Sequence, residues 1–294
     1  MGPPYYAAPP SATQAGDVLG KLRSNKLILH LSAGALGGAV GALLAEVVPQ
    51  EYSTSRLMTI WVTGLWSLLF TSVIATALFL SDAWHQRREL RPGRIGLTWL
   101  FGAAAGFVAG AVAQAVYLIP VDSFEFKNYV LRTFCWGIAG ALIGGLLSRT
   151  VPNLGVGRGI AAGFVGGCIG GISFVLIAQQ LPETWGRVVG IATLGLSLGL
   201  AMYVVEKLFR EASLEVIWAP GETTQIGLGL QPITIGGNIE DDVFVRELPP
   251  NVSTIVLNNG QIEHFENYSG ARTLLTNGSQ LQVGPVYLVI HARQ

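Results

Sequence analysis

Long apolar runs separated by short polar connections fill residues 27–208, and the pattern changes after residue 210. A helix needs about 20 apolar residues to cross the hydrocarbon layer of a bilayer, and each run approaches or exceeds that length. The pattern therefore predicts an α-helical membrane domain of six transmembrane helices. The predicted spans are Leu27–Val48, Leu57–Leu80, Ile95–Ile119, Val130–Leu147, Gly159–Leu181 and Val188–Leu208.

Glycine recurs at every fourth position in several of these runs. Residues four apart share one face of a helix, and in lipid a glycine face lets two helix backbones approach closely. We therefore predict glycine-zipper packing, and a glycine-lined pore or hinge is the alternative. The predicted packing residues are Gly159, Gly163, Gly167 and Gly171 in the fifth span and Gly102, Gly106 and Gly110 in the third.

The second span differs from this scheme. The second has only Gly64, together with Trp61, Trp66 and Phe70, so it is predicted to face lipid or a partner subunit. A homo-oligomer is therefore left open. Few ionisable or amide side chains fall inside the spans, and each is expected to reach the interface or a neighbouring backbone. They are His30 and Glu46 in the first span and Gln114 in the third.

Basic residues are distributed unevenly between the two sides of the predicted spans. Eleven lysines and arginines flank the spans on one side and four on the other. Because cytoplasmic connections carry the excess of basic residues, both termini are predicted to be cytoplasmic. Residues 1–17 lack a basic region followed by an apolar core, so we expect the first span to be retained. These features predict an integral protein of a bacterial inner membrane.

After residue 210 the apolar residues alternate with polar ones over short runs that turn sequences separate. Asn-Gly pairs at 259–260 and 277–278 are typical hairpin signals. Nine such runs within about 80 residues predict an antiparallel β-sandwich. The predicted organisation is a disordered Pro/Ala-rich tail over residues 1–25, the six-helix domain over 26–210 and a cytoplasmic sandwich over 211–294.

Composition and motifs exclude several classes of function. Only 12% of the residues are charged and the net charge is zero, so a nucleic-acid partner is not expected. Cys135 and Cys168 lie in apolar runs, which predicts neither a disulfide nor a metal site. No catalytic or phosphate-binding motif occurs along the chain. We therefore predict a protein that is not an enzyme and that has no cofactor, metal or catalytic residues.

The last 80 residues carry a spacing of short motifs that points to a known family. They begin with LEVIWAPGE at 214–222, continue with ITIG at 233–236 and Asp-Val at 242–243, and end with TNGSQLQVGPVYLVI at 276–290. This segment resembles a forkhead-associated (FHA) domain. The resemblance covers roughly the last quarter of the chain and implies a β-sandwich that binds other proteins.

Members of this family bind phosphothreonine peptides through an arginine directly after the ITIG-like strand and a Ser-Arg-x-His stretch further on. The arginine position is Gly237 here, and the later stretch keeps only Ser253. Glu240, Asp241 and Asp242 add negative charge nearby, whereas phosphate is held by charge-assisted bonds. The resemblance therefore implies a degenerate member with Ser253 as its candidate partner-binding residue.

Two hypotheses about function follow from these observations. The first is an adaptor or scaffold, in which the bilayer anchors an FHA-like domain that binds an unidentified cytoplasmic protein without phosphate. The second is a glycine-zipper channel or small-solute transporter that the β domain regulates. The scarcity of ionisable groups in the spans favours the adaptor, because transport of ions usually leaves such groups there.

Overall fold

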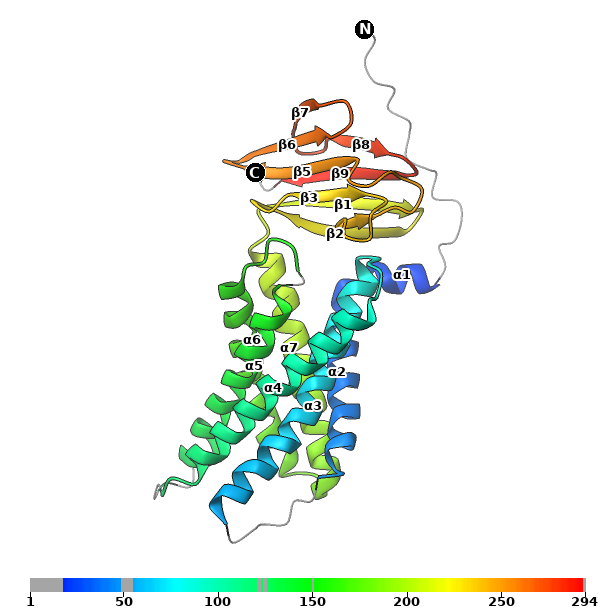
Figure 1. Ribbon diagram of the computed structural model, residues 1–294. Helices are drawn as coiled ribbons and strands as arrows, with labels where there is room; N and C mark the ends of the chain where they lie inside the picture. The colour runs from blue at the N-terminus through cyan, green and yellow to red at the C-terminus, as the bar shows by residue number, and fades with distance from the viewer. Residues whose placement is uncertain (1–17, 49–54, 121–122, 124–125, 150, 293–294) are drawn as a thin grey trace. The chain divides into compact units, whose positions relative to one another are not determined.

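The computed structural model describes residues 18–48, 55–120, 123, 126–149 and 151–292 (Figure 1). The chain divides into two compact units. One, the helical unit, consists of Leu27–Asp82 and Leu90–Leu208. The other, the β unit, combines three separate stretches of the chain, Met1–Lys26, Ala83–Glu89 and Phe209–Gln294. Short segments on either side of the first two spans therefore belong with the C-terminal strands.

Within the described residues, six helices are long and apolar enough to cross a membrane. The fourth of these spans, Tyr129–Leu147, joins the end of a short π-helix, η1 (Phe126–Leu131), to α5. The prediction of six apolar spans is confirmed, and these features indicate an integral membrane protein. The helices are α2 (Lys26–Ala45), α3 (Arg56–His85), α4 (Pro92–Tyr117), α5 (Arg132–Leu147), α6 (Val156–Ala178) and α7 (Glu183–Leu208).

Helix α3 places Trp66 and Phe70 inside the helical unit, so the prediction that this helix faces lipid or a partner subunit is wrong for the face that carries them. Trp66 is 9% exposed and Phe70 is fully buried, although Trp61 remains exposed. The reason lies in the neighbouring helices. The glycine faces of α2 and α4 pack against α3, as Gly41 against Phe70 and Gly102 against Ala75 illustrate. Helices without bulky side chains leave room for a neighbour that has them.

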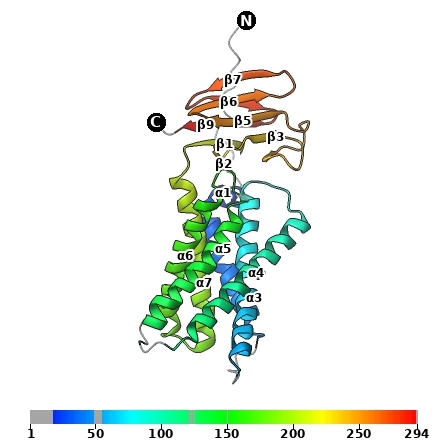
Figure 2. The ribbon, with the colours of Figure 1, turned by 60° about the vertical axis from the view of Figure 1, so that its left-hand side comes forward.

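Helices α5, α6 and α7 lie side by side in the helical unit (Figure 2). Large buried side chains from α3 and α7, including Phe70, Ile74, Ile191 and Leu198, supply most of the volume of the core. Small residues on α5 and α6 let the backbones of those two helices come into contact. The helical unit therefore combines interfaces of backbone contact, between α5 and α6 and between α2 and α7, with a core filled by large side chains.

The strands of the β unit form two sheets, in the orders β2-β1-β9-β8 and β4-β3-β5-β6-β7. All pairs are antiparallel except β3 with β4. Inward side chains of both sheets join one apolar core, so the sheets form two layers. The strands are β1 (Ala212–Ala219), β2 (Glu222–Leu228), β3 (Ile233–Gly236), β4 (Val243–Phe244), β5 (Ser253–Asn258), β6 (Gln261–Glu266), β7 (Ala271–Leu275), β8 (Gln280–Val283) and β9 (Val286–Ala292).

The β-rich C-terminal region predicted from the alternating pattern is confirmed. Strand β5 illustrates why these residues form it, since Ser253, Ile255 and Leu257 are buried while the residues between them are partly exposed. Side chains that alternate in this way cover one face of a sheet and leave the other to solvent. The same alternation along β1 and β9 closes the opposite layer of the core.

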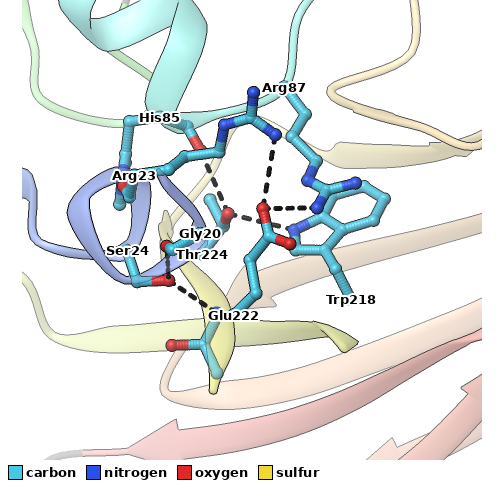
Figure 3. A network of polar contacts seen from close by, with 9 residues as sticks. Gly20, Arg23, Ser24, His85, Arg87, Trp218, Glu222 and Thr224 are labelled. Carbon is cyan, nitrogen blue, oxygen red and sulfur yellow. Dashed lines mark hydrogen bonds and ion pairs between the residues drawn. The ribbon is translucent and has the colours of Figure 1, made fainter. Parts of the chain in front are cut away.

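The segment before the first span is partly helical. Residues 1–17 of the predicted disordered tail lie outside the described residues, but Val18–Ser24 form helix α1. The prediction of disorder up to residue 25 is therefore wrong for these seven residues. Their ordering has a physical reason in the β unit, because Ser24 and Arg23 bind β2 (Figure 3).

Candidate functional site

The predicted glycines of α6 lie against the glycines of α5. A Cβ atom built on Gly163 would overlap the carbonyl oxygen of Gly140, and one on Gly159 would lie 2.6 Å from that of Gly144. Gly167 and Gly171 continue the same face against the backbone and side chain of Trp136. A side chain larger than hydrogen cannot be accommodated where two backbones touch. All four predicted glycines of this helix therefore lie in one interface.

The predicted glycines of α4 lie against hydroxyl side chains of α3 instead. A Cβ on Gly102 would lie 2.9 Å from the Cβ of Ala75, whereas Cβ atoms on Gly106 and Gly110 would overlap the hydroxyls of Thr71 and Ser67. The Thr71 hydroxyl donates to its own helix and reaches the carbonyl of Gly102 at 3.1 Å. This interface therefore has hydroxyl side chains where the contact of Gly140 with Gly163 in the α5–α6 interface has only backbone.

In the β unit, three loops are hydrogen-bonded into one surface, which we call the loop end. It comprises residues 237–242, 245–252 and 267–270. The amide of Gly237 donates to the carbonyl of Pro249 (2.8 Å), and the side chain of Asn267 donates to that of Asn251 (2.9 Å). Tyr268 donates to the carbonyl of Pro250 and is 67% exposed. The loop end thus presents an ordered polar surface with an exposed aromatic ring.

Ser253 does not belong to this exposed surface. It is 1% exposed, and its Oγ lies 2.6 Å from Nε2 of His264 on the adjacent strand β6. Burial lowers the pKa of His264, and the nearby carboxylate of Glu266 opposes that shift. The predicted contact between Ser253 and a partner stays a prediction, and the burial of this hydroxyl opposes it.

The carboxylates near Gly237 hold the loops together. Asp241 is buried and accepts hydrogen bonds from the amides of Asn238 and Asn251. Asp242 accepts from the amide of Thr234 and pairs with Arg88 at 3.0 Å. Asp241 and Asp242 therefore bind donors within the β unit, and Glu240 is exposed.

Two membrane-flanking segments bind β2 through a cluster of polar contacts (Figure 3). The carboxylate of Glu222 pairs with both Arg23 of the first segment and Arg87 of the second. The hydroxyl of Ser24 accepts from the amide of Thr223, and the hydroxyl of Thr224 donates to the carbonyl of His85 (3.0 Å). Residues far apart in sequence are therefore joined at one strand.

Aromatic rings complete this cluster. The guanidinium of Arg87 lies 4.7 Å from the ring centre of Trp218, whose indole nitrogen donates to Thr224. The guanidinium of Arg23 lies 5.0 Å from the ring of Trp84. Cation–π contacts of this kind add to the ion pairs. Basic residues that the sequence analysis counted only for orientation thus also hold the β unit together.

The helical unit contains more buried charge than the sequence predicts. The carboxylate of Glu46 accepts two hydrogen bonds from Arg187, which also binds Glu183. His30 lies 3.9 Å from Asp82, and both side chains are about 5% exposed. Glu46 thus lies beside the oppositely charged Arg187, and His30 lies beside the carboxylate of Asp82.

Asp82 and Glu206 are buried carboxylates that the sequence analysis did not single out. Asp82 falls beyond the predicted end of the second span at Leu80, yet α3 continues to His85. No glycine or proline follows Leu80 until Pro92, and that absence of a helix-ending residue is the signal for the longer helix. Glu206 is 8% exposed near the end of α7.

No family model matches this chain, and the searches of curated proteins and of solved structures found no match either. Among the described residues, no group of three or more His, Cys, Asp or Glu side chains is placed to hold a metal ion. The loop end and the buried groups of the helical unit therefore have to be interpreted from their own chemistry.

Proposed function

We propose that this protein is a membrane-anchored adaptor whose β unit is a degenerate FHA-like sandwich that binds a cytoplasmic protein at the loop end. The observation that supports this proposal is the ordered loop surface with Tyr268 exposed on it. Tyrosine supplies a large rigid contact area with a polar tip and is enriched at protein interfaces. Loops already fixed by hydrogen bonds lose little conformational entropy when a partner binds.

Phosphate-independent binding follows from the residues at the positions that the family uses. Gly237 stands where family members have an arginine, and a Cβ there would overlap the carbonyl oxygen of Leu248. Any larger side chain at 237 therefore requires the loop to move. Ser253 is buried against His264 and offers no hydroxyl to a phosphate. Without these donors a phosphate dianion would lose its hydration without adequate replacement.

The membrane anchor and the β unit are joined by a short stretch of chain. Only residues 209–211 separate the end of α7 from the start of β1. The segments 18–24 and 83–89, which flank the first two spans, bind the same β unit. An adaptor built in this way has its β unit tethered to the membrane by a short linker, which suits a partner that works there.

Crosslinking at the loop end tests the proposal in the full-length protein. A photoreactive amino acid replaces Tyr268 in one variant and Gln282, which is exposed on β8, in the control. We expect position 268 to crosslink a discrete protein and position 282 not to do so. The purified partner should then bind the full chain about tenfold more weakly after Tyr268→Ala and unchanged after Gln282→Ala, since a central interface tyrosine contributes on the order of 1–2 kcal/mol.

Treatment of the identified partner with phosphatase distinguishes binding that needs phosphate from binding that does not. Equal affinity before and after treatment supports binding without phosphate. Loss of affinity would overturn the phosphate-independent reading, whereas equal crosslinking from positions 268 and 282 would overturn the loop end as the binding surface. Whatever the effect of phosphatase, the adaptor proposal requires that the partner bind the Tyr268→Ala variant more weakly than the unchanged chain.

The alternative, a channel or small-solute transporter, is favoured by one observation. His30 and Asp82 lie together inside the helical unit, and ionisable groups at such positions often mark ion pathways. Proteoliposomes with an internal pH-sensitive dye test it, because a proton-coupled pathway should respond to an imposed gradient and lose that response after Asp82→Asn. An adaptor predicts no flux above that of empty vesicles.

A further inference from the structure

The helical unit contains a cavity of about 340 Å³ that neither the adaptor function nor the buried ion pairs explain. Side chains from α3, α4, α5, α6 and α7 line it. Those from α3 and α5 come from the first halves of their helices, and those from α4 come from the second half. The cavity therefore lies toward the end of the bundle that holds the first, third and fifth connections, which the basic-residue count predicts to be extracytoplasmic.

One wall of the cavity is a continuous row of aromatic rings. The ring centres of Trp66 and Phe70 are 4.9 Å apart, those of Phe70 and Trp136 are 5.6 Å apart, and those of Trp136 and Phe174 are 5.5 Å apart. The glycine face of α4, with Gly106 and the small residues around it, forms another part of the lining. Large rings beside residues without side chains create a space that an apolar group can enter.

Charged groups also line the cavity, and their partners differ. Arg187 is neutralised by Glu46 and Glu183, as described above. Arg132 lies 5.6 Å from the ring centre of Tyr117, and among the described residues no carboxylate pairs with it. A guanidinium is always charged and offers several donors in a fixed plane. Arg132 is therefore the cation of this lining that remains available to an anion.

A second polar group of the lining also lacks a partner. The indole nitrogen of Trp66 is buried, and it has no hydrogen-bond partner among the described residues. A buried indole N–H normally donates to an acceptor, because a buried donor without a hydrogen bond is unfavourable. The side chain as a whole is only 9% exposed. A molecule in the cavity that carries an acceptor would supply what this donor lacks.

From these observations we propose that the cavity binds an amphipathic anion. Its phosphate or carboxylate group pairs with Arg132, and its apolar part lies along the aromatic wall. The volume is at the lower end of the range of small-molecule pockets, about 300–1,000 Å³, so it fits a compact ligand or one chain of a larger one. Two sources have this chemistry, namely an anionic lipid of the bilayer and a free amphipathic phosphate or carboxylate.

Thermal unfolding of the full chain in an uncharged detergent tests the proposal. The probes are decyl phosphate and dioleoyl phosphatidylglycerol, with decanol and dioleoyl glycerol as their uncharged counterparts. We expect a saturable rise in unfolding temperature with an anionic probe and none with its counterpart. Saturation by phosphatidylglycerol identifies a lipid, whereas saturation by decyl phosphate alone identifies a free amphiphile.

Two variants locate the site. Arg132→Gln should weaken binding of the effective probe at least about tenfold, because it removes a charge-assisted contact. Arg149→Gln, an exposed arginine in another connection, should leave binding unchanged. Ala113→Phe should abolish binding by filling the space between α4 and the aromatic wall. The proposal is overturned if charged and uncharged probes act alike, or if Arg132→Gln and Arg149→Gln bind equally.

Discussion

Glycine serves different purposes in the two units of this protein. In the helical unit it removes a side chain where another helix must come close, as at Gly163 and Gly140. In the β unit it supplies a backbone conformation, as at Gly278, where φ is +81° and nothing lies within 4 Å of the missing Cβ. One residue type thus answers a packing requirement in one unit and a conformational requirement in the other.

This difference predicts how each unit responds to substitution. A side chain added between two helix backbones cannot be accommodated by rotating a neighbour, because the obstacle is a carbonyl group of the main chain. A side chain added at a turn meets open space and only strains the local backbone. The size of the effect should therefore fall from backbone-packed glycines to side-chain-packed glycines and then to turn glycines.

The largest effect is expected for Gly163→Leu in α6. The new side chain would force α5 and α6 apart along their closest contact, which should reduce the free energy of unfolding by about 3 kcal/mol or prevent folding. Thermal unfolding of the detergent-solubilised chain measures this loss. Gly157→Leu is the matched control, because Gly157 lies on the same helix with open space around it.

This pair also tests the interpretation of the glycine face itself. If Gly163→Leu and Gly157→Leu had the same small effect, the α5–α6 contact would not stabilise the helical unit. Purification yield alone does not decide the matter, since a variant that folds poorly is also made poorly. Gly163→Ala gives a smaller perturbation that keeps the comparison measurable if the leucine variant cannot be obtained.

An intermediate effect is expected for Gly106→Ala in α4. Its Cβ would overlap the hydroxyl of Thr71 and lie 2.7 Å from the carbonyl oxygen of Ser67. We expect a loss of about 1–3 kcal/mol, as for other overpacked interiors. Gly96→Ala should be neutral or stabilising, because that glycine of the same helix has no atoms within 4 Å and alanine is the better helix former.

The partner side chain distinguishes this interface from that of α5 and α6. Thr71→Ala removes the hydroxyl that the added methyl group meets, so it should restore part of the stability lost in Gly106→Ala. No truncation of a side chain can restore Gly163→Leu in the same way, since Gly140 presents only backbone. A double variant no more stable than Gly106→Ala would show that the carbonyl of Ser67 alone sets the cost.

Much of the fold follows from the sequence because its patterns are strong. Strands β3 and β8 begin and end where the alternation and turn residues predict, at Ile233–Gly236 and Gln280–Val283. The burial of Ser253 could also be predicted from the sequence, because Ser253 lies on the same face of its strand as Ile255 and Leu257. The resemblance to the FHA family implies that Ser253 contacts a partner, whereas its place on the buried face of β5 argues against that role.

Other features depend on which elements meet, and a periodic pattern does not specify the partner. The burial of Trp66 and Phe70 follows from the glycine faces of neighbouring helices, which the sequence gives without saying where they pack. The cavity beside them depends on the spacing of five helices. The pairing of Glu222 with Arg23 and Arg87 joins three distant parts of the chain. None of these follows from local periodicity.

A smaller effect is expected for Gly278→Ala in the turn between β7 and β8. The positive φ angle disfavours any residue with a Cβ, at a cost of about 1–2 kcal/mol, while the surrounding space is open. Gly278→Asn should cost less than Gly278→Ala, because asparagine adopts this conformation more readily. Hydrogen exchange of peptides from β8 and β9 in the full chain measures both. Equal costs would indicate that the turn changes its conformation.

The smallest effect concerns acid rather than a glycine, and it again separates the two units. Burial lowers the pKa of His264 in the β unit, so the unfolded chain takes up its proton at a higher pH than the folded chain does. Stability from this group is therefore complete above the ordinary histidine pKa of about 6.5 and is lost as the pH falls below it. As the pH falls from about 7.5 to 5.5, the protection of amides in β5 and β6, measured as the intrinsic exchange rate at each pH divided by the observed rate, should therefore decrease.

The chain offers a matched control for that acid sensitivity. His264→Gln keeps a polar side chain beside Ser253 but cannot take up a proton in this range, so the loss of protection should largely disappear. His291→Gln removes an exposed histidine that binds Glu215 and should leave the loss of protection in β5 and β6 unchanged. If the His291 variant lost the pH dependence and the His264 variant kept it, the buried Ser253–His264 pair would not be its source. The acid sensitivity would then arise on the outer face of the opposite sheet, where β1 and β9 pair.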